Sequence, residues 1–442
     1  MVLQIGYSST GTGPRYDLGT TDSIFVIPGA YIVSIDDYGI SGIGSYHTVT
    51  VAGAVFGGFI GVNLGNDPAT DTGQYVHVLA GGMVAAYQTA DTGGIRVYGS
   101  STIVNDGQIS AYNATIFFDG AGGSSSLVNR GIITASNNGV TIVDGTSNTL
   151  ANFGTIQGDV FAYYAFSGTA SDLIRNYGQI IGEISTGDGA DTFVSHGGTV
   201  EGDIHLGAGN DRYVGTSGGV TGAVYGDAGA DTFFGNQNAA DVFVGGADVD
   251  TLDFRLGGQV TLALDLSFAQ NGAALGDTYF EMENVFGSDT GNDVIRGNPA
   301  ANALFGWGGN DSLDGAGGAD VLRGGVGVDT LTGGTGDDTF RFSALNECGD
   351  LITDFSGSVG NNDRFQITAA AFGGMMPLGT LAASQFQTRT DNVAQDADDR
   401  FIFNTTDRTL WFDADGNGAG AAIMVADLQA GAVVTAADIL LI

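Results

Sequence analysis

Residues 306–341 read GWGGNDSLD, GAGGADVLR, GGVGVDTLT and GGTGDDTFR, which are four consecutive units of nine residues. Two looser units, SDTGNDVIR and GNPAANALF, precede them at residues 288–305. Each nonad joins a glycine-containing turn to an acidic or amide residue at its sixth position and an apolar residue at its eighth. The sixth positions are Asp293, Asn302, Asp311, Asp320, Asp329 and Asp338. This pattern predicts a parallel β-roll in which every nonad contributes one buried side chain and one acidic turn.

The acidic turns favour calcium as their ligand. Ca²⁺ takes about six to eight oxygen ligands, which glycine carbonyls and an Asp carboxylate of an adjacent turn can supply together. Asn302 keeps an oxygen ligand without the charge, so we expect a weaker site at its turn. The glycines expected to line the sites are Gly306, Gly308, Gly315, Gly317, Gly324 and Gly333.

A period of 20 residues precedes the nonads. Apolar and aromatic residues recur at this step, as in Phe193, Tyr213 and Phe233. Stacked coils would superpose such residues in core columns. The same coils carry acidic turns, and we expect their aspartates to bind calcium along one edge that continues into the nonads. These aspartates are Asp191, Asp211, Asp231 and, after a step of 19, Asp250.

Glycines also recur through the first half of the chain, at steps of 20 to 29 residues from Gly53 to Gly218. Four of these glycines follow an Asn by two residues, at Asn105, Asn129, Asn152 and Asn176. In stacked coils, equivalent Asn side chains can bond to one another in a ladder. The segment is therefore predicted to form a parallel β-helix with a buried Asn ladder.

These periods predict an all-β chain in which a right-handed parallel β-helix continues into a calcium-binding parallel β-roll and a small C-terminal β-rich region. The expected divisions are β-helix coils at 1–184, calcium-edged coils at 185–253, connecting strands at 254–287, the nonad roll at 288–342 and the C-terminal region at 343–442. Residues 1–48 are expected either to cap the helix or to contact a neighbouring subunit.

The chain carries 49 acidic and 13 basic side chains, a net charge of −36, and no lysine. This charge disfavours nucleic acid and anionic membranes as partners. Hydrophobic residues make up 43% of the chain, too many for a disordered acidic tail. Carboxylate repulsion therefore has to be offset by bound cations. We find no Sec-type signal peptide and no apolar run long enough for a transmembrane segment.

The nonads resemble those of the RTX (repeats-in-toxin) family of exported calcium-binding proteins. Residues 282–293, 351–367 and 401–442 are similar to the segments that flank the repeats in that family. The resemblance implies calcium ions as cofactors, export by type I secretion machinery from a Gram-negative bacterium, and an extracellular or cell-surface location. The N-terminal coils resemble the Asn-Gly repeat helices of bacterial surface proteins, and some S-layer proteins combine β-rich units with RTX motifs.

We predict no enzymatic activity, because the chain lacks an H-E-x-x-H zinc motif and an obvious cluster of basic residues. The leading hypothesis is a secreted structural protein that assembles with its own copies into a filament or surface layer. The alternative is an adhesin for a carbohydrate or cell surface, with aromatic residues of VFAYYAF at 160–166 as stacking platforms or as core. A polysaccharide lyase or epimerase is the third possibility.

Three smaller features are interpreted as structural. DADGNG at 413–418 imitates half of an EF-hand loop, but Met424 occupies the twelfth position, which favours a plain turn. The four histidines lie outside any metal or triad spacing. Cys348 lies next to Glu347 and close to Asp350, which predicts a raised thiol pKa and an unreactive side chain.

Overall fold

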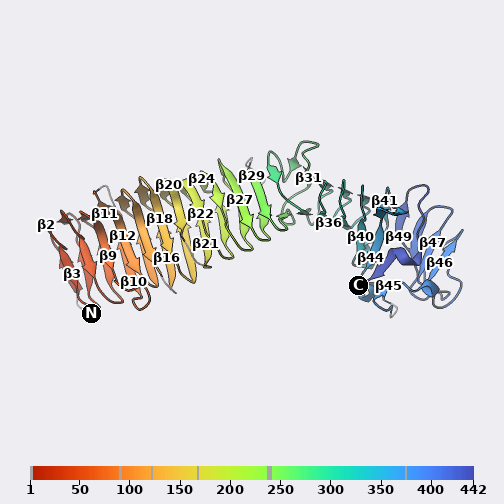
Figure 1. Cartoon of the computed structure of the whole chain (residues 1–442), viewed down its shortest axis with the longest axis horizontal. Coiled ribbons are helices and arrows are strands. Elements are labelled where there is room, and N and C mark those ends of the chain that lie inside the picture. Colours follow the sequence, from red (N-terminus) through yellow and green to blue (C-terminus); the bar gives the residue numbers. More distant parts are fainter. Residues whose placement is uncertain (1–2, 89–91, 121–122, 167–168, 236–240, 374–375) are drawn as a thin grey trace. The chain divides into compact units, whose positions relative to one another are not determined.

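The computed structural model describes residues 3–88, 92–120, 123–166, 169–235, 241–373 and 376–442. The fold is all-β, with 52% of the residues in strands and 3% in helices, and the strands stack as coils of a parallel solenoid (Figure 1). This confirms the predicted β-helix and β-roll class. The coils fall into two compact units, Met1–Asp248 and Val249–Ile442.

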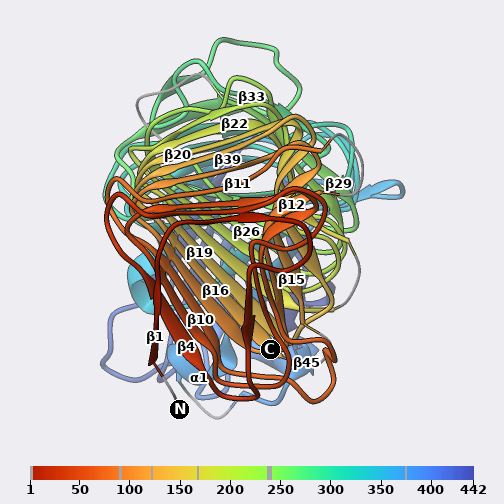
Figure 2. The same ribbon diagram turned by 90° about the vertical axis from the view of Figure 1, so that its left-hand side faces the viewer.

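The coils of the first unit contribute parallel strands to three walls, of which the last coils occupy only the first and third, and Figure 2 views these coils from the N-terminal end. The first wall consists of β1 (Leu3–Gly6), β4 (Ser23–Val26), β7 (Thr48–Val51), β10 (Gln74–Val78), β13 (Ser101–Asn105), β16 (Ser124–Asn129), β19 (Ser147–Asn152), β21 (Ser171–Asn176), β23 (Thr192–His196), β26 (Arg212–Ser217) and β28 (Thr232–Phe234).

The other two walls belong to one continuous sheet. The second wall consists of β2 (Ser9–Gly11), β5 (Tyr31–Ser34), β8 (Ala54–Gly57), β11 (Met83–Ala86), β14 (Gln108–Ala111), β17 (Ile132–Ala135), the long β20 (Thr155–Ala165), β22 (Gln179–Ser185) and β24 (Thr199–Glu201). The third consists of β3 (Tyr16–Leu18), β6 (Ile40–Gly42), β9 (Ile60–Leu64), β12 (Gly93–Tyr98), β15 (Ala114–Asp119), β18 (Asn138–Val143), β25 (Ile204–His205), β27 (Ala223–Ala228) and β29 (Val242–Ala247). The second half of β20 and of β22 also runs in this wall.

The recurring glycines lie at the turn between the first and second walls, where successive coils approach closely. A Cβ atom at Gly154 would strike the carbonyl oxygen of Gly131, and one at Gly178 would strike that of Gly154. Only glycine fits such a stack of turns. The glycine period therefore measures the length of each coil.

Residues of the 20-residue period superpose as predicted. Phe193 pairs with Tyr213, and Tyr213 pairs with Phe233. All three are buried, and the rings of Phe193 and Tyr213 stack with centroids 5.8 Å apart. Ile184, Ile204 and Val224 form a second buried column. The core of these coils is therefore built from like side chains stacked on like.

The second unit has two walls. The first contains β30 (Thr251–Asp253), β34 (Asn284–Phe286), β36 (Ala303–Gly308), β38 (Val321–Val326), β40 (Thr339–Phe342), β44 (Arg364–Ile367), β50 (Ile439–Leu441) and the antiparallel β45 (Gly379–Thr380). The second contains β32 (Asn271–Gly272), β31 (Val260–Ala263), β35 (Val294–Arg296), β37 (Ser312–Asp314), β39 (Thr330–Thr332), β41 (Asp350–Ile352), β49 (Ile423–Leu428), β48 (Thr409–Phe412), β47 (Phe401–Asn404) and β46 (Phe386–Arg389).

Two nonads make one coil of the roll. Leu304 pairs with Leu322 on the first wall, whereas Leu313 pairs with Leu331 on the second. Both pairs join residues 18 positions apart, and all four side chains are buried. Successive acidic turns therefore alternate between opposite edges. The sequence predicted an acidic edge that continues from the β-helix into the nonads, and the roll has two such edges, each with every second nonad, because each nonad contains only a single strand and turn.

The C-terminal region closes the roll with antiparallel strands, since β48 pairs antiparallel with both β47 and β49. Its remaining elements are short: η1 (Leu345–Glu347), α1 (Ala369–Phe372), η2 (Ala383–Gln385), η3 (Ala436–Asp438), β42 (Gly357–Ser358) and β43 (Asn361–Asn362), with β33 (Thr278–Phe280) before the roll. Within the described parts of the chain, no helix combines the length and hydropathy needed to cross a bilayer.

Candidate metal sites

The sixth-position residues of the nonads form two hydrogen-bonded rows. On one edge, the backbone N–H of Asp293 donates to Oδ1 of Asp311 at 2.8 Å, and that of Asp311 donates to Asp329 at 2.7 Å. On the opposite edge, Asn302 donates in the same way to Asp320, and Asp320 to Asp338. One oxygen of each carboxylate thus accepts a hydrogen bond from the backbone of the preceding coil.

The other carboxylate oxygen of these aspartates faces the turn. Oδ2 is buried and has no hydrogen-bond partner among the described residues in Asp311, Asp320, Asp329 and Asp338. These side chains are at most 3% exposed. A buried carboxylate oxygen without a partner is costly, and coordination of a cation would satisfy it.

The first-position glycines line the same turns. A Cβ atom at Gly306 would clash with Oδ2 of Asp311 and lie 2.7 Å from the carbonyl oxygen of Gly324. Gly315 bears the same relation to Asp320 and to the carbonyl of Gly333, 2.5 Å away. Carbonyl and carboxylate oxygens therefore converge on a space that only glycine leaves open, and Gly324 and Gly333 likewise lie against Asp329 and Asp338.

The third-position glycines occupy different surroundings. A Cβ atom at Gly308 would lie 2.6 Å from the carbonyl oxygen of Asp289, and one at Gly317 would lie 2.9 Å from the Thr335 hydroxyl. Neither glycine lies against a sixth-position carboxylate. The structure thus brings Gly306, Gly315, Gly324 and Gly333 to the aspartates, and it places Gly308 and Gly317 farther along the turn.

Burial dominates the electrostatics of the turns. It raises the pKa of both Asp311 and Asp320 to about 7, with neighbouring carboxylates adding to the shift. The pKa values of Asp293, Asp329 and Asp338 are raised for the same reason. A divalent cation among these groups would oppose this shift by favouring the ionised form.

The 20-residue coils of the first unit repeat this geometry. The N–H of Asp191 donates to Oδ1 of Asp211 at 2.7 Å, and Asp211 donates to Asp231 at 2.8 Å. Oδ2 of Asp191 and of Asp211 has no hydrogen-bond partner within the described chain. Burial raises the pKa of Asp191 to about 8, of Asp231 to about 7 and of Asp211 to about 6. Asp250, in the second unit, is fully buried and donates its N–H to Glu283.

Four further buried aspartates bond to a neighbouring coil and were missed in the sequence, and three of them belong to the rows. Asp350 accepts the N–H of Asp329 at 3.0 Å, and Asp363 accepts that of Asp338 at 3.1 Å, so each extends one row of the roll. In the first unit, Asp172 donates to Asp191, and Asp241 accepts from Val220. Each of the four precedes a buried apolar residue by two positions, which is the Asp-x-apolar ending of the nonad. That short signal would have found them.

In the described part of the chain, no three His, Cys, Asp or Glu side chains lie close enough together to hold a metal ion by themselves. Most calcium ligands in these turns would therefore be carbonyl oxygens. The 413–418 segment forms a turn in which Asp413 and Asp415 accept backbone N–H groups, as a plain turn would. Burial raises the pKa of Cys348 to about 12, as predicted in direction.

The histidines serve structural roles. His47 is fully buried, and its ring nitrogens lie 3.0 Å from the carbonyl oxygens of Asp22 and Ile43. His77 bonds to Asp106 and His205 to Asp227. His196 stacks on Tyr177.

Comparison with known proteins supports the calcium interpretation of the roll. The RTX calcium-binding nonapeptide repeat family (4 copies) matches residues 288–322 and 314–344. The chain therefore carries RTX calcium-binding nonapeptide repeats at residues 288–344. Among solved structures, a subunit of the Azotobacter vinelandii mannuronan C5-epimerase is 28% identical to this chain, with a TM-score of 0.23, and the match covers 34% of this chain and 77% of that one. No curated protein matches the chain.

Proposed function

We propose that this RTX protein is a secreted structural protein whose coils are held together by calcium and which assembles with its own copies outside a Gram-negative cell. The rows of buried carboxylates carry the calcium part of the proposal. Their Oδ2 atoms lie at turns that belong to a calcium-binding repeat family, and RTX repeat proteins are typically secreted. Type I secretion machinery is the proposed route of export.

The proposed calcium ligands are the turn carbonyls together with the row aspartates. They include Asp250, Asp293 and Asn302, although the amide of Asn302 donates to the Glu283 carbonyl and its Oδ1 accepts from Asn298. The neutral amide of Asn302 thus occupies the position that a charged carboxylate occupies in the other nonads. We therefore propose a weaker site at Asn302, which its substitution by Asp would strengthen.

Self-assembly is supported by the first coil of the β-helix. Its strands β1, β2 and β3 pair with β4, β5 and β6, respectively, and with no other strand among the described residues. Parallel edges of this kind accept a further strand from another molecule. Contact between two different surfaces of the same chain produces an open filament when the rotation between neighbours does not close a ring.

The test is a calcium titration of the purified chain after treatment with chelator, followed by circular dichroism and negative-stain electron microscopy. We expect millimolar calcium to increase the β-signal and then to produce filaments or layers. An unchanged β-signal would disprove calcium-coupled folding. Monomers alone in saturating calcium would instead disprove self-assembly and leave calcium binding standing.

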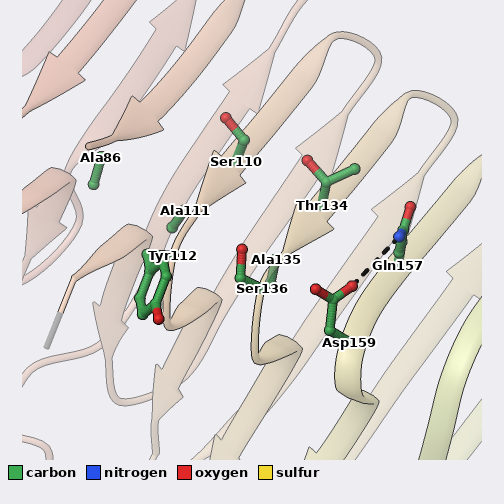
Figure 3. A pocket seen from close by; sticks show the side chains of 9 residues that line it. All are labelled: Ala86, Ser110, Ala111, Tyr112, Thr134, Ala135, Ser136, Gln157 and Asp159. Atoms are coloured by element: carbon green, nitrogen blue, oxygen red, sulfur yellow. Dashed lines mark hydrogen bonds between the residues drawn. The ribbon is translucent and has the colours of Figure 1, made fainter. Parts of the chain in front are cut away.

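An adhesin for a neutral carbohydrate is the second candidate, and a groove on the first unit favours it. The groove has a volume of about 410 Å³ and crosses successive coils where the second wall bends into the third (Figure 3). Ser110, Thr134 and Gln157 line one side, while Tyr112 and Asp159 lie beyond the bend. Hydroxyl, amide and aromatic groups suit a sugar, and the absence of basic residues from this lining disfavours an acidic one.

The 160–166 segment supports the adhesin less well. Tyr163 is buried in the core, whereas Phe161 and Tyr164 stack on one another with centroids 4.6 Å apart. Tyr164 also contacts Phe166, with ring centroids 6.0 Å apart. A glycan array with the calcium-loaded chain tests the adhesin, and binding that survives Tyr112→Ala and Gln157→Ala would place the sugar elsewhere.

We propose no enzymatic activity, and a lyase or epimerase remains the third candidate. Two arginines of the N-terminal coils are engaged in ion pairs, because Arg96 bonds to Asp119 and Arg130 to Asp106. Arg96 also lies 4.8 Å from the ring centres of both Tyr98 and Phe117. Unsaturated or epimerised products after incubation with acidic polysaccharides would overturn the non-enzyme proposal.

A further inference from the structure

The acidic row of the first unit begins at a defined coil. In the first wall, Ser101 pairs with Ser125, Ser125 with Asn148, and Asn148 with Asp172. Asp172 then donates its N–H to Asp191, which continues the row. One buried column thus changes along the coils from hydroxyl to amide to carboxylate.

Asp172 differs from the aspartates that follow it, because protein groups satisfy both of its oxygens. The hydroxyl of Tyr163 donates to Oδ2 at 2.7 Å, and the amide of Asn148 donates to Oδ1 at 2.7 Å. Tyr163 reaches this carboxylate from β20 in the third wall and is 2% exposed. At Asp211, by contrast, Oδ2 has no such partner in the described chain. Tyr163 therefore supplies at Asp172 what a cation would supply at the later turns.

The coils before Asp172 have their own polar ladder, which involves no carboxylate. Asn105 donates its side-chain amide to Asn129, Asn129 to Asn152, and Asn152 to Asn176, at 2.8 to 2.9 Å. All four residues are fully buried. Asn105, Asn129 and Asn152 donate a second bond to a backbone carbonyl of the next coil. This ladder ends at Asn176, in the same coil in which the acidic row begins.

We propose that Asp172, bound by Tyr163 and Asn148, is the metal-free end of the acidic row. The coils from residue 3 to residue 176 then fold without calcium, and they provide the preformed surface on which the coils from Asp191 onward stack when calcium binds. This inference rests on the proposed calcium binding by Asp191 and Asp211.

Hydrogen–deuterium exchange of the full chain, with peptides resolved by mass spectrometry, tests the inference in chelator and in calcium. We expect peptides from residues 3–176 to be protected in both conditions, and peptides from 186 onward only in calcium. Rapid exchange throughout the chain in chelator would overturn this inference alone. Full protection in chelator would overturn the proposed calcium-dependent folding as well.

Two matched substitutions locate the end of the row. Asp191→Asn should lower the number of bound calcium ions measured by equilibrium dialysis, whereas Asp172→Asn should leave it unchanged. Loss of an ion in Asp172→Asn would make Asp172 a ligand and disprove the inference. Tyr163→Phe should speed exchange of peptides around 171–185 in chelator about tenfold. Tyr164→Phe, a change on the outer face of the same strand, should not, and equal exchange in both variants would overturn the role of Tyr163.

Discussion

Asp311 illustrates how one side chain serves two purposes. Its Oδ1 accepts a backbone N–H from the coil before it, and its Oδ2 faces the turn where Gly306 leaves room. The first contact aligns the coils, while the second requires a cation or a proton. The conflict between burial and charge at this residue decides when the fold is stable.

The metal-free protein should be more stable at pH 5 than at pH 8. Burial raises the pKa of Asp311 to about 7 and of Asp191 to about 8, above the value of about 3.9 for an unfolded Asp. The folded state therefore binds more protons, and this stabilisation is lost as the pH rises through the folded pKa values. Urea denaturation in chelator, followed by circular dichroism, measures the effect. A midpoint that is equal or higher at pH 8 would contradict it.

Removal of one rung from the Asn ladder should destabilise the β-helix. Asn129→Ala removes the side-chain partner of Nδ2 of Asn105 and of Oδ1 of Asn152. We expect a cost of about 2 kcal/mol in the free energy of unfolding. Ser126→Ala, a half-buried site on the same strand, is the control and should change little. Chemical denaturation in chelator measures the contribution of this ladder without interference from calcium. Equal stability of the two variants would show that the ladder contributes little to the stability of the β-helix.

At the scale of the element, the turn of each nonad depends on a missing side chain. Gly306→Ala would place a methyl group against Oδ2 of Asp311 and the carbonyl of Gly324. We expect at least tenfold weaker calcium binding, measured by isothermal titration calorimetry, because the added atom occupies the space between the oxygens. Gly357→Ala is the matched control, since a Cβ atom there meets nothing within 4 Å. Equal loss of affinity in both variants would argue against a site at Gly306.

The sequence predicted these elements to different degrees. Periods of nine and 20 residues gave the strands, the core columns and the aspartate rows, because in a stacked fold each column is a spacing in sequence. Spacing did not reveal that consecutive nonads alternate between edges, since every nonad looks alike whichever wall it joins. The bond of Tyr163 to Asp172 also lay beyond prediction, because it joins residues that no repeat relates.

At the scale of the whole molecule, the net charge of −36 must be distributed over closely stacked coils. Nonspecific screening can reduce repulsion among surface charges, but it does not reach buried oxygens. The carbonyl-rich turns should therefore distinguish between cations. Their selectivity separates site binding from simple charge neutralisation.

Magnesium should restore much less structure than calcium at equal concentration and ionic strength. Mg²⁺ requires near-octahedral geometry and gives up its water reluctantly, whereas these turns offer few side-chain ligands and many carbonyls. Circular dichroism of the chelator-treated chain after addition of either ion checks this. Equal recovery with both ions would indicate that charge neutralisation alone drives folding.

The alternation of nonads between the two walls of the roll also limits how its length can change. Each nonad advances the chain from one wall to the other, and two are needed to return to the same wall. Gain or loss of two nonads keeps the C-terminal region in phase with the strands that precede the roll, whereas gain or loss of one turns that region to the opposite side. Lineages that vary the number of repeats can therefore lengthen the protein in even steps without reorienting its end, and odd steps would present a different face to any neighbour.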